Sequence, residues 1–259
     1  MRYWNRNLIS ATERRPTAAG SSGIFDLRSQ SIYKNADAWP VNGELTTSGL
    51  FMHLDAGDSS SYSGSGTAWN DLTSNGLDFT LTNGPTYSSN FGGYISFDGV
   101  NDYASLSSGW QSFGTDPYSI EFWHRPHSFA EFESMISNTS GNTGTFQISY
   151  NSGGAIQHRD SSQDLTSDIR FNVNAWKQVV VVREGTGEGQ FKFYENGSLN
   201  TTTTSTTDIN SSDQIQIGRN RANDRYFDGD LAIIRIYRNK ALNAAEVAGN
   251  YFYNVGRFV

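Results

Sequence analysis

A strand–turn–strand pattern in residues 94–103 constrains the fold of this chain more than any other feature. Ile95 and Phe97 alternate with polar residues, as they do in a strand with one buried face. Asp98–Gly99 follows at once and favours a tight turn, because both residues tolerate unusual backbone angles. A second alternating run covers residues 118–126. The two runs predict an antiparallel β protein.

The rest of the chain extends this pattern. Asn196–Gly197 is a strong hairpin turn, and Asn243 with Glu246 forms the capping box of a short C-terminal helix. We therefore predict an all-β fold: a two-sheet antiparallel jelly-roll sandwich with an extended N-terminal arm and a short C-terminal helix. Further strands are expected at residues 49–56, 78–81, 145–150, 177–183, 190–194, 214–218 and 230–237.

Composition excludes several classes of function. The chain has 259 residues, of which 36% are hydrophobic, enough for a core of its own. A net charge of -7 argues against a nucleic-acid partner. The chain has no cysteine, which excludes disulfides and thiolate metal sites. No apolar stretch is long enough to span a membrane, so membrane insertion is not expected.

Residues 1–45 differ from the remainder and are predicted to form an anchoring arm on a globular domain of residues 46–259. Residues 1–40 carry six basic and three acidic side chains, whereas the rest of the chain is acidic. Apolar residues in an arm without a core must bury against something, either the chain's own domain or a neighbouring subunit. The residues assigned to anchoring are Arg14, Arg15, Ile24, Phe25, Leu27 and Trp39.

Several motifs resemble the laminin-G-like branch of the concanavalin A-like superfamily. They are the Phe97–Tyr103 turn, the Trp-led strand at residues 174–183, the Tyr-x-Asn-Gly hairpin at residues 194–197 and the closing run at residues 226–247. The resemblance covers roughly residues 50–252. It implies a jelly roll that binds carbohydrate or builds an adhesive surface, since only some branches of the superfamily are enzymes.

A narrower resemblance is to virion proteins of tailed bacteriophages. It is carried by residues 54–72, 83–89 and 97–103, and by residues 23–27 and 39–40 of the arm. It implies a capsid decoration protein, head fibre or tail fibre component on the virion surface, synthesised in the host bacterial cytoplasm. The first residues lack an apolar signal region, so we expect no secretory signal. Partners would be other virion proteins and further copies of this chain, with a trimer as one option, although no coiled-coil heptads support it.

The sequence offers little that is typical of catalysis. Glycanases use paired carboxylates, and Glu131 and Glu133 are expected on one strand face, but the Glu-x-Asp-x-x-Glu run of the best-known branch is missing. His124 and His127 fall on opposite faces of their predicted strand, which is poor for shared metal ligation. No nucleophile elbow is present. We therefore predict that the protein is not an enzyme.

Several loop residues are candidates for binding calcium or a glycan. Calcium needs several oxygen ligands, and Asp98, Asn101 and Asp102 are the first candidates for a calcium site. Asp55 with Asp58 is a second group, and Asn223 with Asp224 and Asp228 is a third. A sugar would stack on an aromatic ring beside polar groups. The candidates for glycan binding are Tyr62, Trp69, Trp110 and Tyr226, whereas Trp123 and Trp176 are assigned to the core.

These observations predict a non-enzymatic phage virion surface protein. Its arm would dock on the particle, and its jelly roll would stabilise the particle or adhere to host surface glycans. A free carbohydrate-binding lectin and a polysaccharide-degrading glycanase remain the alternatives.

Overall fold

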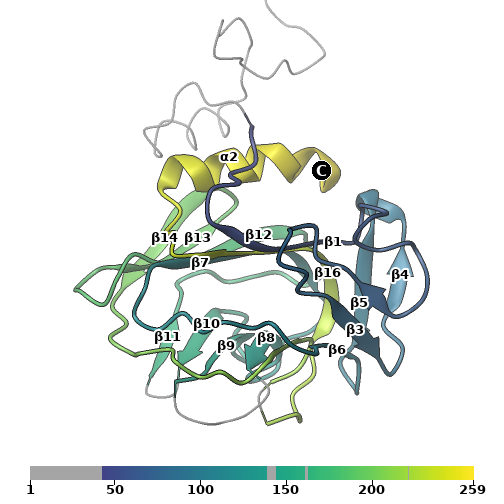
Figure 1. Ribbon diagram of the computed structural model, residues 1–259, viewed down its shortest axis with the longest axis horizontal. Helices are drawn as coiled ribbons and strands as arrows, with labels where there is room; N and C mark the ends of the chain where they lie inside the picture. The colour runs from purple at the N-terminus through teal and green to yellow at the C-terminus, as the bar shows by residue number, and fades with distance from the viewer. Residues whose placement is uncertain (1–42, 139–143, 161–162, 221) are drawn as a thin grey trace, which may run out of the picture.

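The computed structural model describes residues 43–138, 144–160, 163–220 and 222–259. The predicted arm, with Arg14, Arg15, Ile24, Phe25, Leu27 and Trp39, lies almost wholly outside these residues. Within them the chain forms two antiparallel sheets packed face to face, which confirms the predicted sandwich (Figure 1).

Each sheet has eight strands. The first sheet runs in the order β14 (Ser198–Thr203), β13 (Phe191–Glu195), β12 (Lys177–Arg183), β7 (Tyr118–Pro126), β16 (Asp228–Arg238), β5 (Tyr94–Asp98) and β4 (Thr86–Ser88), with β1 (Leu50–Asp55) also paired to β16. The second runs β11 (Asp164–Thr166), β10 (Ile156–Asp160), β9 (Phe146–Tyr150), β8 (Ser134–Asn138), β15 (Ile215–Ile217), β6 (Tyr103–Leu106), β3 (Phe79–Thr82) and β2 (Ala68–Trp69).

Helix α2 (Ala244–Asn254) covers the outer face of the first sheet (Figure 1). Its first turn has the predicted capping box, in which the Asn243 side chain accepts the backbone N–H of Glu246 and the Glu246 carboxylate accepts that of Asn243. No described helix has the length and apolarity needed to cross a membrane. Short 3-10 turns, Asn90–Gly92 and Val255–Arg257, lie before β5 and after α2.

The central strands of the first sheet are buried on both faces. Along β7, Ile120 and Phe122 pack into the core between the sheets, whereas Trp123 points outward and stacks on Phe258 with ring centroids 4.3 Å apart. In β12, alternate valines likewise face the sheet core and helix α2. Burial on both faces explains why these strands read as continuous apolar runs.

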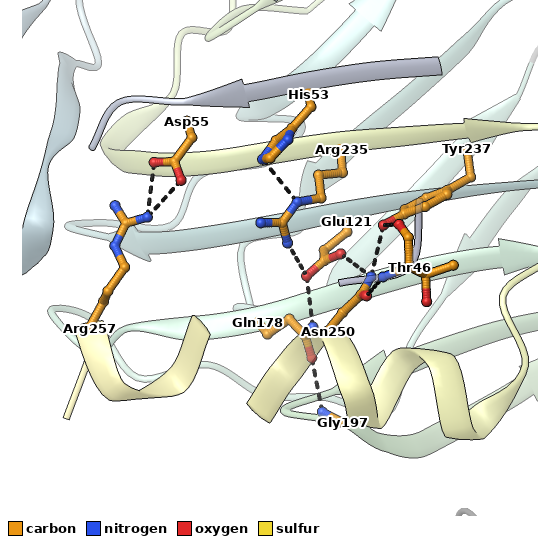
Figure 2. A network of polar contacts seen from close by, with 10 residues as sticks. All are labelled: Thr46, His53, Asp55, Glu121, Gln178, Gly197, Arg235, Tyr237, Asn250 and Arg257. Atoms are coloured by element: carbon orange, nitrogen blue, oxygen red, sulfur yellow. Dashed lines mark hydrogen bonds and ion pairs between the residues drawn. The ribbon is translucent and has the colours of Figure 1, made fainter. Parts of the chain in front are cut away.

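A buried polar network joins the first sheet to helix α2 (Figure 2). Glu121 of β7 pairs with Arg235 of β16 at 3.2 Å, and both side chains are completely buried. The Glu121 carboxylate also accepts hydrogen bonds from Gln178 of β12 and Asn250 of α2, at 2.8 Å each. His53 of β1 lies 3.1 Å from Arg235. The network therefore ties four strands to the helix.

The same network fixes the segment that enters the domain. Asn250 accepts the backbone N–H of Thr46 at 2.9 Å, and the Tyr237 hydroxyl donates to the Thr46 carbonyl at 3.1 Å. Beyond the helix, Arg257 forms a two-pronged ion pair with Asp55 of β1 at 2.8 and 2.9 Å. The beginning and the end of the described chain are thus held on one sheet.

Replacing Arg235 tests this network. In Arg235→Met the Glu121 carboxylate stays buried without its cation, so the free energy of unfolding should fall by about 3–5 kcal/mol in urea denaturation. Lys192→Met, which breaks the half-exposed pair with Glu184, should cost less than about 1 kcal/mol. Equal losses in the two variants would contradict the role given to the buried pair.

Three histidines, His53 half-buried and His124 and His158 fully buried, predict a pH dependence. Burial, with the nearby charges of Arg235 and Arg257, lowers the pKa of His53 to about 3. Burial likewise lowers the pKa of His124 to about 3 and that of His158 to about 4. Unfolded histidine takes up its proton near pH 6.5, so the unfolded state binds more protons below that pH. The stability that comes from keeping these histidines neutral is therefore fully present above about pH 6.5. It is lost as the pH falls toward 4.

Each histidine should remove about 1.4 kcal/mol per pH unit between about pH 6 and 5. Urea denaturation across this range measures the slope. In His124→Phe, which replaces a ring packed among Tyr150 and Phe171, the slope should be smaller by that amount. A free energy of unfolding that stays constant from pH 7 to pH 5 would show that the histidines are not held neutral.

Candidate functional site

Three connections between the sheets meet at one end of the sandwich. The chain passes from β5 to β6, from β7 to β8 and from β15 to β16, each time changing sheet. The register places all three together, since Asp228 faces Asp98 and Gly229 faces Pro126. Between them lies a pocket of about 420 Å³, lined by Gly99, Ala130, Glu131, Glu133, Asp224, Arg225 and Tyr226.

The β5–β6 turn forms one wall of this pocket. Asp98 Oδ1 accepts the backbone N–H groups of Val100, Asn101 and Asp102 at 2.8, 3.1 and 3.4 Å, and Asp102 Oδ2 accepts that of Asp98 at 3.1 Å. Burial acts to raise the pKa of Asp98, but these backbone hydrogen bonds outweigh it and the pKa is lowered. Burial, followed by the charge of Asp98, raises the pKa of Asp102.

These contacts bear on the predicted calcium site. In this conformation Asp98 and Asp102 build the turn, because one oxygen of each carboxylate already accepts backbone N–H groups and is not free for a cation. Within the described ranges no group of three or more His, Cys, Asp or Glu side chains is arranged to hold a metal ion. The residues therefore do not form a ready ligand set, and calcium at this turn stays a prediction.

The β7–β8 connection forms the second wall. The Glu133 carboxylate accepts the backbone N–H of Ala130 at 2.7 Å and the hydroxyl of Ser128 at 3.3 Å. Burial, with a smaller contribution from Asp228, raises the pKa of Glu133 despite these hydrogen bonds. Glu131 is less buried, and its carboxylate accepts the backbone N–H of Ser152 at 3.1 Å.

The prediction that Glu131 and Glu133 share a strand face is wrong. Residues 131 and 132 form a turn, and β8 begins only at Ser134. Phe132 has φ of +65°, which ends any extended run at this position. Glu131 and Glu133 meet at the pocket because the chain turns between them.

The β15–β16 connection supplies the third wall. Arg225 donates to the Glu131 carbonyl at 2.8 Å and lies over the Phe132 ring, 5.3 Å from its centroid. Tyr226 is half-buried, and its hydroxyl donates to the Asn223 carbonyl at 3.2 Å. Asp224 is exposed beside them. The pocket therefore presents one aromatic ring, one guanidinium and three carboxylates.

The other predicted glycan-binding aromatics are not at this pocket. Trp69 and Trp110 belong to the core between the sheets, with 0% and 7% of their surface exposed, and Tyr62 is buried with them. A ring packed on all sides offers no face to a sugar, so the assignment of Tyr62, Trp69 and Trp110 to glycan binding is wrong. Tyr226 alone among the four lines the pocket.

The remaining candidates have other partners. Asp55 pairs with Arg257, and Asp58 accepts the backbone N–H of Ser60 at 2.8 Å. Asp228 lies 3.4 Å from His127, which also contacts Asp230 at 3.0 Å. His124 points into the core, opposite to His127. The structure thus brings together members of three separate predictions: Gly99 of the turn, the two glutamates, and Tyr226 with Asp224.

Two features of the structure, one at the pocket and one outside it, were missed from the sequence. Arg225 carries no motif, and its position beside Glu131 follows from a contact between residues 94 positions apart. Trp176, assigned to the core, is only half-buried and lies at the surface beside Phe91. The local signal for Trp176 was its place directly before β12, at the end of a polar loop.

Comparison with known proteins agrees with this architecture. Residues 98–248, more than half of the chain, match the family described as the concanavalin A-like lectin/glucanases superfamily. The chain belongs to this superfamily. A comparison with curated proteins finds no match.

Solved structures with the same fold are distant in sequence. Domain 4 of AbnA, an extracellular arabinanase from Geobacillus stearothermophilus, in complex with arabinotriose, is 18% identical with a TM-score of 0.61, covering 78% of this chain and 98% of that domain. Trypanosoma rangeli sialidase is 14% identical with a TM-score of 0.61, covering 87% of this chain but 38% of the sialidase. The receptor binding domain of botulinum neurotoxin type G is 17% identical with a TM-score of 0.59, covering 79% of this chain and 53% of that one.

Proposed function

We propose that the pocket at the end of the sandwich binds carbohydrate without cleaving it. The observation that carries this proposal is the half-exposed Tyr226 ring beside the carboxylates of Glu131 and Asp224 and the guanidinium of Arg225. Sugars present an apolar ring face together with hydroxyl groups, and such a site offers both an aromatic surface and hydrogen-bonding groups. The lectin/glucanase family and the arabinotriose complex of the AbnA domain support the same ligand class.

The contacts of the carboxylates favour binding over hydrolysis. A retaining or inverting glycosidase needs one carboxylic acid and one carboxylate free to reach the scissile bond. Here both oxygens of Glu133 accept hydrogen bonds from their own loop, and Glu131 holds the backbone of Ser152. These groups act as anchors of the pocket wall.

Replacing Tyr226 tests the proposal. In Tyr226→Ala the stacking surface is lost, so retention on immobilised oligosaccharides should weaken roughly tenfold. Arabinotriose and an array of neutral oligosaccharides are the first probes. The measurement is the concentration of full-length protein that gives half-maximal binding to each. Tyr253→Ala, which removes an exposed tyrosine from helix α2, is the matched control and should bind like the wild type.

Three results would overturn this assignment. Wild-type protein that retains none of the glycans, or Tyr226→Ala protein that binds them unchanged, would remove the pocket from consideration. Release of reducing sugar that Glu133→Gln abolishes would instead make the protein a glycosidase.

We also propose that the jelly roll is carried on a phage particle, with residues 1–45 as its anchor. The basic composition of residues 1–40 and the phage-like runs at residues 54–72 and 97–103 support this role. Partners would be capsid or tail subunits and further copies of this chain. Cryo-electron microscopy of particles from the source should show density for the domain on the virion surface, and its absence would leave a free lectin as the alternative.

A further inference from the structure

A second cluster of aromatic rings lies on the outer face of the first sheet. Phe91, Tyr94 and Trp176 surround the guanidinium of Arg125, whose carbon lies 5.5, 5.2 and 5.3 Å from their ring centroids. We call these four residues the aromatic surface. Trp176 packs in turn on Phe258, at a centroid distance of 4.8 Å, so the cluster adjoins the aromatic layer beneath the C-terminal segment.

Phe91 is held at the surface of the protein. The residue is 40% exposed, and its backbone has φ of +52°, a conformation that disfavours bulky residues. Arg257 fixes the turn from below by donating to the carbonyls of Phe91, Gly92 and Gly93 at 3.4, 3.2 and 3.2 Å. A strained, fixed and exposed phenylalanine points to a use other than core packing.

The surface carries no unpaired charge from Arg125. Its guanidinium donates to Asp230 at 2.6 Å and to the Tyr94 hydroxyl at 3.2 Å. An anionic ligand therefore gains little, whereas the Tyr94 hydroxyl and the Arg125 guanidinium remain as polar neighbours of the exposed ring. A neutral ligand with one apolar face and polar edges suits this combination.

A protein partner is the less suitable occupant. Stable protein interfaces bury more than about 1,000 Å² and centre on contiguous apolar patches. The other large hydrophobic residues exposed in the described part of the chain are Val100, Val173, Leu199, Tyr253 and Val259, which lie in the β5–β6 turn, the loop before β12, strand β14, helix α2 and the C-terminal segment. A single exposed ring with polar neighbours matches the size of one sugar unit.

We propose that the aromatic surface is a second carbohydrate-binding site, in which a neutral sugar stacks on Phe91. It is separate from the pocket, because its residues come from the outer face of the first sheet and the turn before β5. Two such sites on one domain would bind a polysaccharide at two points, which multiplies a weak affinity.

The test is the Phe91→Gly variant of the full-length protein. Glycine adopts positive φ without strain, so the melting temperature should stay within about 4 °C of the wild type while strain relief offsets lost ring contacts. Half-saturation on immobilised neutral oligosaccharides of graded length should weaken roughly tenfold. Phe91→Trp should retain binding, and Leu199→Ala, which removes an exposed side chain from β14, is the matched control.

Combination with Tyr226→Ala separates this proposal from the pocket. Binding that Tyr226→Ala abolishes and Phe91→Gly leaves unchanged would overturn the aromatic surface alone. Binding lost in Phe91→Gly and kept in Tyr226→Ala would support the aromatic surface and remove the pocket. A large fall in melting temperature with unchanged binding would show that Phe91 only covers Trp176. Wild-type protein that binds none of these oligosaccharides would overturn both proposals.

Discussion

The buried ion pair between Glu121 and Arg235 is the constraint on which the rest of the structure depends. Two charges without solvent need hydrogen-bond partners, and the surrounding strands and helix α2 supply several through Gln178, Asn250 and His53, although Nη2 of Arg235 is buried without one. Each partner comes from a different element, so these elements can pack in only one register. Because the desolvation of two charges offsets much of their attraction, the pair contributes chiefly by specifying how the helix sits on the sheet.

The register of the strands in the first sheet also determines where the residues of both proposed binding sites lie. The pocket is built from connections that leave the ends of β5, β7 and β15, and β16 aligns those ends through its pairing with β5 and β7. Arg235 and the Asp230 that pairs with Arg125 lie on the same strand, β16. A change in the register of β16 would therefore displace the aromatic surface and the pocket together.

The sequence predicted local features well because they depend on neighbouring residues. The capping box at Asn243, the Asn196–Gly197 hairpin and strand 177–183 are each encoded within a few positions and are confirmed. Burial of aromatic rings is not local. Trp69 reads as a loop residue, yet its two-residue strand pairs with β3 and places the ring in the core. The pocket joins residues more than 90 positions apart, so no spacing in the sequence marks it.

Backbone strain marks candidate binding positions that the sequence does not reveal. Seven described non-glycine residues have positive φ, and five of them are asparagines, which accept this conformation at low cost. The other two are Phe91 and Phe132, both at the surface beside arginine guanidinium groups and both next to a proposed binding site. Phenylalanine is a costly choice at such a position, where glycine or asparagine would serve the turn better. The doubly covered first sheet can offset that cost, and rings held rigidly at the surface lose little further entropy when a ligand stacks on them.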